Sequence, residues 1–291
     1  GTDLFAGGWI GIFAALIMAG LGMWYVESQW KRAQARGEGF VENAQDRRME
    51  QLIGDPNDAP VWWMALIPMV VVLGSIMLPR AILGLADWSE SDSIVARVLL
   101  FSAAQPIIWP SISLILGSLT CVLLFPGLRR KAAQAFGQGA DDSIMPLLNT
   151  AAVIGFGGVV TQTAGFAQFA NWILNVDLPP LLSVFASVSV VSAIVGSSSG
   201  GLQIFMQSLG PHYIEMGVDP EILHRIAAIA AGGLDSLPHC GAVIATFMIM
   251  GITHKEAYRD IFVVTVAVPV IACLASIALL MSLGMGMVSA G

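Results

Sequence analysis

Residues 232–241 read GGLDSLPHCG, and they interrupt one of the most apolar stretches of the chain. An acid, a hydroxyl, a proline and a histidine fall between Asp235 and His239, and glycines bound the group. Apolar segments flank it at 222–231 and 242–251. If these flanks lie at membrane depth, the motif is an ionisable break in a transmembrane helix. Such breaks are costly in lipid and persist mainly where they line a pathway for a substrate or an ion.

The composition supports the membrane interpretation. The chain is 56% hydrophobic and 11% charged, whereas an average soluble domain is about 25% charged. Several runs reach the ~20 apolar residues that cross a bilayer. The first run has no basic residue before it and no clear cleavage site, so we interpret it as a span and not as a signal peptide. The sequence therefore predicts an all-α polytopic membrane protein.

The charge balance and the cysteines exclude other classes. The net charge of −7 argues against a nucleic-acid partner. The three cysteines, Cys121, Cys240 and Cys273, all lie in apolar segments. An odd number in such positions predicts free thiols without a disulfide framework. The adjacent pair His239 and Cys240 has a poor spacing for metal ligands, so we expect no metal site.

The first half of the chain predicts long spans with short polar connections. Spans are expected at 5–26 and 61–85, and a long or kinked one at 93–125, where Pro106 and Pro110 interrupt the apolar run. The polar segment 27–60 and the basic run 129–131 carry an excess of Lys and Arg. The positive-inside rule places both in the cytoplasm and the N-terminus outside.

Beyond residue 142 the apolar segments become shorter, and glycine clusters and prolines separate them. Glycine permits a turn and proline ends a helix, so this pattern predicts re-entrant hairpins and discontinuous helices. A final span is expected at 261–285, entering from the cytoplasm. The number of crossings between 142 and 251 stays open.

Three polar breaks are candidate functional segments. The first is 149–158 (NTAAVIGFGG), continuing to 163, the second is 196–201 (GSSSGG), and the third is 235–239. Broken helices direct their N-terminal N–H groups at anions. The second break, leading into a helix expected to begin near Leu202, suits a carboxylate. It contains no Lys and so is not a phosphate-binding loop.

Each break also has a structural interpretation. Gly and Ser in membrane helices form tight turns or allow close helix packing, and Asp235 and His239 could simply satisfy each other or a backbone group. A hydrolase is a further alternative, because Ser, His and Asp are all present. However, Asp235, Ser236 and His239 are too close in sequence for a catalytic triad, and no G-x-S-x-G or H-E-x-x-H motif occurs.

Several segments resemble the gluconate:proton symporter family of the ion transporter superfamily. They are 149–158, 196–202 (GSSSGGL), 221–241 (EILHRIAAIAAGGLDSLPHCG), 251–254 and 258–262. The resemblance extends over about 149–262, and upstream only the hydropathy agrees. Family members carry more N-terminal spans, so the resemblance implies that this chain corresponds to the C-terminal portion, with the second of two inverted repeats.

The resemblance implies a symporter of the bacterial inner membrane that imports small hydroxycarboxylates, such as gluconate and other sugar acids, glycerate or 3-hydroxybutyrate. It implies a homodimer in lipid, without a cofactor, in which the coupling ion is H⁺, with Na⁺ as the alternative. Residues 1–140 would form scaffold spans with a cytoplasmic loop at 27–60. Residues 141–260 would form the transport region, and 261–291 the final helix.

The resemblance and the breaks together assign roles to individual residues. Asp235 and His239 are expected to carry or relay the coupling proton, since His titrates near neutral pH and burial can raise the pKa of Asp towards it. The substrate-binding candidates are Asn149, Thr150, Gly155, Gly157, Ser197, Ser198, Ser199, Gly200, Gly201 and Ser236. A sodium-coupled carrier of di- or tricarboxylates stays open as an alternative, although no Lys or Arg lies in the breaks to face a second carboxylate.

Overall fold

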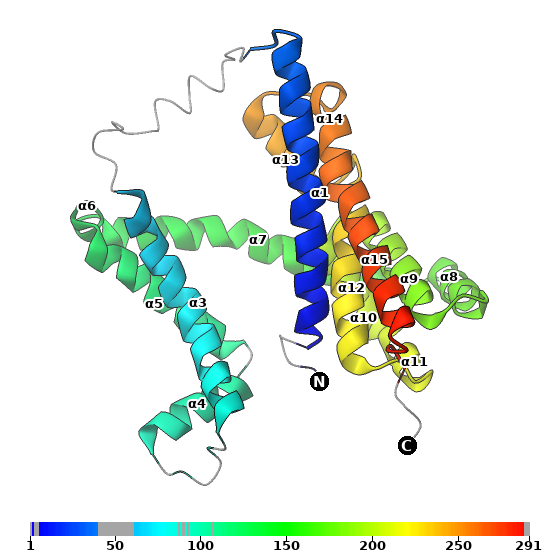
Figure 1. The fold of residues 1–291 in the computed structure, drawn as a ribbon, viewed down its shortest axis with the longest axis horizontal. Coiled ribbons are helices and arrows are strands. Elements are labelled where there is room, and N and C mark those ends of the chain that lie inside the picture. Colours follow the sequence, from blue (N-terminus) through cyan, green and yellow to red (C-terminus); the bar gives the residue numbers. More distant parts are fainter. Residues whose placement is uncertain are drawn as a thin grey trace. The chain divides into compact units, whose positions relative to one another are not determined.

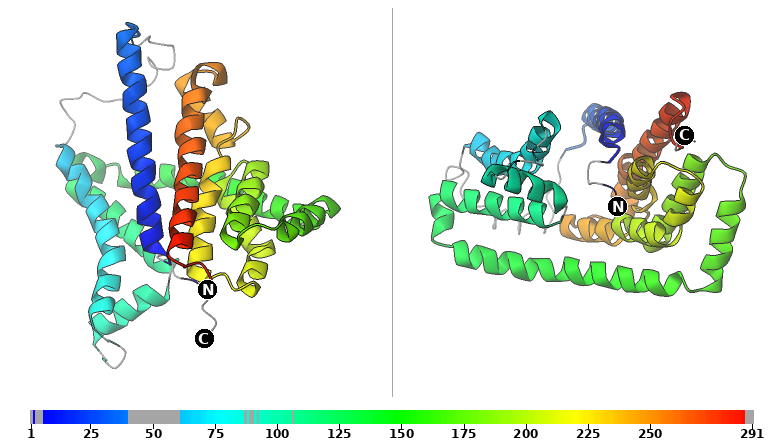
Figure 2. Two further views of the ribbon diagram at one scale, coloured as in Figure 1. Left: turned by 45° about the vertical axis from the view of Figure 1, so that its right-hand side comes forward. Right: turned by 90° about the horizontal axis from the view of Figure 1, so that it is seen from below.

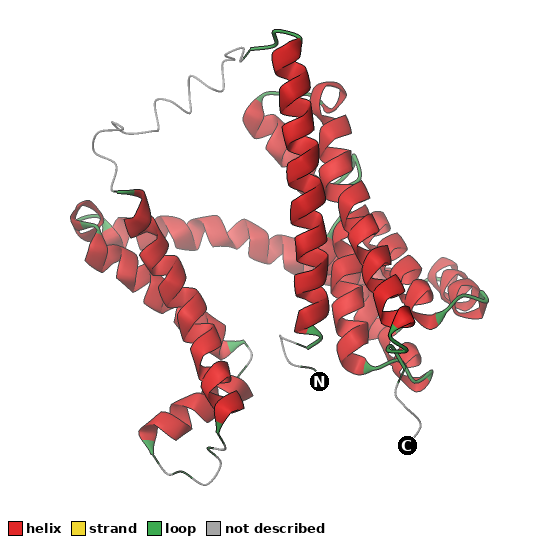
Figure 3. Ribbon diagram, in the orientation of Figure 1, coloured by secondary structure: helices red, strands yellow, loops and turns green. Residues whose placement is uncertain are grey.

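The structure, a computed structural model, describes residues 2, 6–39, 61–86, 88, 91, 93–105 and 107–287. The structure does not describe the side chains of Met145, Pro146, Asn149, Thr150, Val153, Ile154 and Ile249. The secondary structure in this part of the chain is helical, apart from one isolated bridge between Val218 and Met287 (Figure 3). The predicted all-α fold is confirmed.

The helices keep the labels of Figure 1. They are α1 (Gly8–Ala35), α3 (Trp62–Leu85), α4 (Ile94–Ala104), α5 (Ile108–Leu124), α6 (Pro126–Arg129), α7 (Ala132–Val160), α8 (Ala164–Asn175), α9 (Pro180–Val195), α10 (Ser198–Ser208), α11 (Gly210–Glu215), α12 (Pro220–Leu234), α13 (Gly241–Met250), α14 (His254–Phe262), the π-helical turn η2 (Val263–Ala267) and α15 (Val268–Ser282).

Three helical segments within the described residues are long and apolar enough to cross a membrane: Gly8–Ala35, Trp62–Leu85 and His254–Ser282. They match the spans predicted at 5–26, 61–85 and 261–285. The first is longer than predicted, because the helix continues through the polar residues after 26. There Glu27 and Lys31, one turn apart, form an ion pair of 2.6 Å. The rest of the predicted loop, 40–60, lies outside the described residues.

The predicted span at 93–125 consists of two helices instead of one. The axes of α4 and α5 differ by 111°, which fits either a broken span or a re-entrant segment. Gln105, before a proline, has φ −118° and ψ 78°, outside the helical region. Proline disfavours the helical conformation of the preceding residue, so the sequence itself explains the end of α4. Pro110 is tolerated because it lies in the first turn of α5.

The chain forms two compact units. Unit 2 comprises Ile53–Pro146, and in it α3 packs against α5. The indole Nε1 of Trp109 donates to the carbonyl of Ser75 at 2.8 Å. Gly117 of α5 lies against Val72, where a larger side chain would collide. Small residues therefore permit the close approach of these helices, as is common in membranes.

Unit 1 comprises Gly1–Leu52 and Leu147–Gly291. Its core lies between α9, α10, α12 and α15, and α1 packs beside α15 (Figures 1 and 2). The most buried core side chains include Val184, Val188, Phe205, Leu223, Ile226 and Ile277. The predicted functional division near residue 140, into scaffold and transport regions, stays a prediction.

Candidate functional site

Helices α9 and α12 are too short to cross a bilayer. They have 16 and 15 residues, and at 1.5 Å per residue they rise about 24 and 22 Å. The hydrocarbon core of a membrane is about 30 Å thick. A helix of this length that starts at one membrane surface ends inside the hydrocarbon.

Contacts with α1 place the start of α12 near a membrane surface. The guanidinium of Arg225 donates from Nε and from a terminal nitrogen to the carbonyl of Ala6, at 2.9 and 2.7 Å. The amide of Gly7 donates to Glu221 at 3.4 Å. Helix α1 has 28 residues and is long enough to span a membrane, and α12 starts beside its first residues. Asp235 lies at the other end of α12, about 22 Å from its start, which is less than the thickness of the hydrocarbon core.

The break between α9 and α10 is tight and well defined. Gly196 ends α9 in the left-handed conformation, with φ 64°, and its amide donates to the carbonyl of Ser192 at 2.8 Å. Ser197 caps α10, because its Oγ accepts from the amide of Gly200 at 3.4 Å. The helix begins at Ser198 and not near Leu202 as predicted. A Ser at the N-cap explains the difference.

Gly200 and Gly201, at the end of this break, are buried, and Gly201 permits close helix packing. Gly201 lies directly against Ser192 of α9, so even a methyl group would collide with the backbone there. The amide of Gly201 donates to the carbonyl of Ser197 at 2.9 Å, and that of Gly200 is held by the Ser197 hydroxyl. Ser198 and Ser199 begin the helix, and the Ser199 side chain is exposed.

The break between α12 and α13 contains the ionisable motif. Asp235 follows the last residue of α12, and its carboxylate accepts a hydrogen bond of 2.9 Å from the Ser236 hydroxyl. Both side chains are half-buried. The C-terminal end of a helix dipole is negative, so an uncompensated carboxylate is unfavourable there. Cys240 precedes α13 and provides no side-chain cap for its first amides.

The two breaks meet through His239. Its Nε2 lies 2.8 Å from the carbonyl oxygen of Ala193, near the end of α9. Its ring also packs on Gly196, with Cδ2 3.3 Å from where a Cβ would be. A carbonyl only accepts, so Nε2 carries a hydrogen, and this assignment follows from the partner. Nδ1 is then the nitrogen that can gain or lose a proton.

Two helix N-termini therefore begin at one place. α10 starts after Gly196 and α13 starts after His239, and these two residues are in contact. Helix N-termini present free N–H groups and a positive dipole end, which favour an anion. Hydroxyls of Ser197, Ser198, Ser199 and Ser236 lie within these breaks. The arrangement suits a single carboxylate with hydroxyl groups nearby.

The first predicted break is not a break at 149–158. Helix α7 continues through these residues to Val160, and the turn comes at 161–163, where Thr163 caps α8. Each glycine costs a helix only about 1 kcal/mol relative to alanine, and propensity is a weak preference that tertiary context overrides. The side chains of Asn149 and Thr150 lie outside the described part. Gly155 faces open space, while Gly157 packs closely on Ile204 of α10.

Two groups at the site were not predicted from the sequence. One is the carbonyl of Ala193, which as a backbone group has no sequence signal. The other is Ser192, whose buried hydroxyl has no hydrogen-bond partner within the described residues. Buried serines recur on α9, at 183, 187, 189 and 192. That repeat within an apolar helix was the signal that could have found Ser192.

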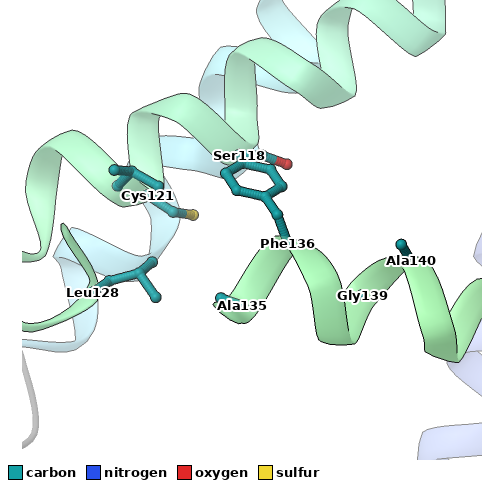
Figure 4. Close-up of a pocket in the computed structure, with 8 residues that line it drawn as sticks. Ser118, Cys121, Leu128, Ala135, Phe136, Gly139 and Ala140 are labelled. Atoms are coloured by element: carbon teal, nitrogen blue, oxygen red, sulfur yellow. The ribbon is translucent and has the colours of Figure 1, made fainter. Parts of the chain in front are cut away.

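A cavity of about 380 Å³ lies elsewhere, between α5, α6 and the first part of α7 (Figure 4). Its walls are mainly apolar, and the ring of Phe136 points towards Ser118 of α5. The lining residues are Ser118, Cys121, Val122, Leu128, Ala135, Phe136, Gly139 and Ala140. None of these is charged, so the cavity offers an anion only two weakly polar side chains and is not the candidate site.

Within the described ranges, no group of three or more His, Cys, Asp or Glu side chains could hold a metal ion. Cys121, Cys240 and Cys273 are free thiols, and the last two are buried. The prediction of free thiols is confirmed.

The fold and the breaks define a class: a multi-pass α-helical membrane protein with discontinuous helices. No protein-family model matches the chain, and no solved structure matches it either. The chain is similar to the uncharacterized transporter YxjC of Bacillus subtilis (strain 168), with 30% identity over 279 residues. The match covers 91% of this chain and 59% of that protein. The chain thus spans less than two thirds of its relative's length, and the similarity connects it with membrane transporters.

Proposed function

We propose that this chain is part of a proton-coupled permease that imports small hydroxycarboxylates, such as gluconate or related sugar acids, glycerate or 3-hydroxybutyrate, across the bacterial inner membrane. One observation carries the proposal. Two helix breaks within apolar sequence touch through His239 and Gly196, so that the N-termini of α10 and α13 begin side by side. Discontinuous helices of this kind form the substrate sites of many secondary transporters.

The substrate carboxylate would lie at the start of α10, against the amides and hydroxyls of Ser198 and Ser199. Ser197 and Ser236 would face its hydroxyl groups. Gly157 and Gly201 would contribute by permitting close helix packing around the site, and Gly200 through its amide, which donates to the Ser197 hydroxyl. Asn149, Thr150 and Gly155, on α7, remain candidates for the far side of the substrate.

His239 and Asp235 would couple the proton to transport. His239 donates from Nε2 to Ala193 whether the ring is neutral or protonated, so a proton can bind Nδ1 without breaking the contact between the breaks. Asp235 lies at a negative helix end with only the Ser236 hydroxyl bonded to it among the described residues. A coupling cation would offset that charge.

Uptake into vesicles tests the function directly. The full-length protein, reconstituted and given an inward pH gradient, is expected to accumulate labelled gluconate, glycerate or 3-hydroxybutyrate. A protonophore should abolish the accumulation, and removal of sodium should not. Accumulation of none of the three would overturn the substrate class.

Two other outcomes separate the alternatives. Uptake that survives the protonophore but needs sodium would indicate a sodium-coupled carrier, and a preference for citrate or succinate would indicate di- or tricarboxylates. Product formation in detergent, without any gradient, would indicate an intramembrane enzyme. We further propose that the permease works as a homodimer, which crosslinking in native membranes would test.

A further inference from the structure

Helices α13 and α14 form a hairpin beside the ionisable break. Gly251 ends α13 in the left-handed conformation, with φ 65°. Thr253 then starts α14 with a capping box: the carboxylate of Glu256 accepts from the Thr253 amide at 2.8 Å and from its hydroxyl at 2.6 Å. The chain therefore turns back sharply, and the start of α14 is fixed. His254 is the first residue of this helix and not part of a loop.

Two side chains of α14 hold the backbone of the break. The Nε2 of His254 lies 2.9 Å from the carbonyl oxygen of Pro238 and donates to it. The hydroxyl of Tyr258 donates to the carbonyl of Ser236 at 3.1 Å. His254 and Tyr258 are four residues apart and so lie on one face of α14. The carbonyls that they hold lie in the break, beyond the last residue of α12, so the two side chains satisfy backbone groups outside the helix.

Ring packing fixes the orientation of both donors. The ring of His254 meets Phe247 of α13 edge-on, with centroids 4.8 Å apart, and lies 5.9 Å from the ring of Tyr258. Tyr258 packs in turn on a small core of Cys240, Val243 and Phe247. Aromatic contacts of this geometry restrict side-chain rotation. Packing therefore defines the positions of both donors, the His254 Nε2 and the Tyr258 hydroxyl.

We propose that His254 and Tyr258 are positioning residues of the anion site. They donate to the carbonyls of Ser236 and Pro238 and thereby fix the backbone conformation of 235–240. The fixed backbone in turn orients Asp235, Ser236 and His239 towards the start of α10. The proposal rests on the proposed function and deepens it, because neither residue is placed against the substrate. The bond from His239 to Ala193 connects the break to α9, and the bonds from His254 and Tyr258 connect it to α14.

Tyr258→Phe tests the proposal most cleanly, because it removes one hydroxyl and keeps the ring. Tyr25→Phe is the matched control: the Tyr25 hydroxyl bonds Asp260 at 2.7 Å, on the same helix α14 but away from the break. In the full-length protein, we expect Tyr258→Phe to raise the KM for hydroxycarboxylate uptake about threefold to tenfold, the effect of one lost hydrogen bond. The maximal rate should change less, and Tyr25→Phe should leave KM unchanged.

His254 offers a test by rescue. His254→Phe keeps the ring packing but loses the donor, and should raise KM to a similar degree. His254→Gln carries an amide nitrogen near the position of Nε2, and should restore much of the loss. Equal KM values for Tyr258→Phe and Tyr25→Phe, or no difference between His254→Phe and His254→Gln, would overturn the proposal.

A second readout does not depend on transport. Cys240, next to the break, is 4% exposed, and its thiol can be followed in a Cys121→Ala, Cys273→Ala background. Loosening 235–240 should speed the alkylation of Cys240 in Tyr258→Phe and His254→Phe, about threefold or more by the same hydrogen-bond energy, but not in Tyr25→Phe. If wild-type protein transports none of the acids and this pattern still appears, the proposed function fails while the positioning role stands. An unchanged alkylation rate overturns the role itself.

Discussion

Both units contain broken apolar helices, and only the breaks of unit 1 have the chemistry of a site. In unit 2, α4 and α5 bend by 111°, but the 94–124 segment contains no Asp, Glu or His. The indole of Trp109, at the start of α5, donates locally to the carbonyl of Ser75. In unit 1, two breaks carry an acid, an imidazole and several hydroxyls, and they touch each other.

A helix break in an apolar segment is therefore not by itself a functional site. Proline suffices to end a helix, as at Gln105, which precedes a proline and ends α4. What distinguishes unit 1 is that polar groups occupy the breaks and that two helix N-termini begin together. Ionisable groups at membrane depth cost too much to be retained without a partner or a task.

The largest effect should come from Asp235→Asn. The amide keeps the shape and the bond with Ser236 but cannot accept a coupling proton, so uptake driven by a pH gradient should fall about 100-fold, the upper range of coupling between two sites. Exchange of labelled for unlabelled substrate, without a gradient, should persist. Asp260→Asn is the control, because that exposed acid bonds Tyr25 and lies outside the breaks. Equal loss of driven uptake in both variants would contradict the special role of Asp235.

An intermediate effect is expected from Gly201→Ala. The added methyl group meets the backbone of Ser192, and overpacking of this kind costs about 1–3 kcal/mol of stability. It should also separate α10 from α9 and lower uptake. Gly22→Ala in α1, where the space is open, should leave the melting temperature in detergent unchanged or higher. If Gly201→Ala has the same melting temperature as wild type, the inferred close approach of α9 and α10 is wrong.

The smallest effect sharpens the comparison between the units. Ser199→Ala removes an exposed hydroxyl at the start of α10, and Ser118→Ala removes one from the cavity in unit 2. We expect the first to raise KM about threefold to tenfold, the effect of losing one ordinary hydrogen bond. The second should leave KM unchanged. A larger increase of KM in Ser118→Ala than in Ser199→Ala would indicate that the site lies in unit 2.

Much of the fold was predictable from the sequence. Apolar runs near 20 residues predicted the spans, because the bilayer thickness fixes their length. Gly196 and the 235–239 motif predicted two true breaks, since one supplies a left-handed turn and the other contains a proline. The start of α10 and the length of α1 were missed, because a serine cap and an i,i+4 ion pair extend helices into polar sequence.

The arrangement of the site was not predictable to the same degree. Glycines at 155, 157 and 158 predicted a break that α7 does not make, because helix propensity only weakly opposes a long apolar helix. The contact of His239 with Ala193 joins residues 46 positions apart through a backbone carbonyl, and no residue pattern records such a partner. His254 and Tyr258 had a readable spacing, but only the turn at Gly251 brings them to the break.

Protection of a thiol at the start of α10 tests the central claim most directly. In a protein with Cys121, Cys240 and Cys273 replaced by Ala, Ser199→Cys should react with a membrane-permeant thiol reagent, because the Ser199 side chain is exposed. If the meeting of the two breaks is the anion site, the transported hydroxycarboxylate should slow this labelling in proportion to occupancy, and Ser118→Cys should not be protected. Labelling of Ser199→Cys that proceeds at the same rate in saturating substrate, in a variant that still transports, would contradict the account.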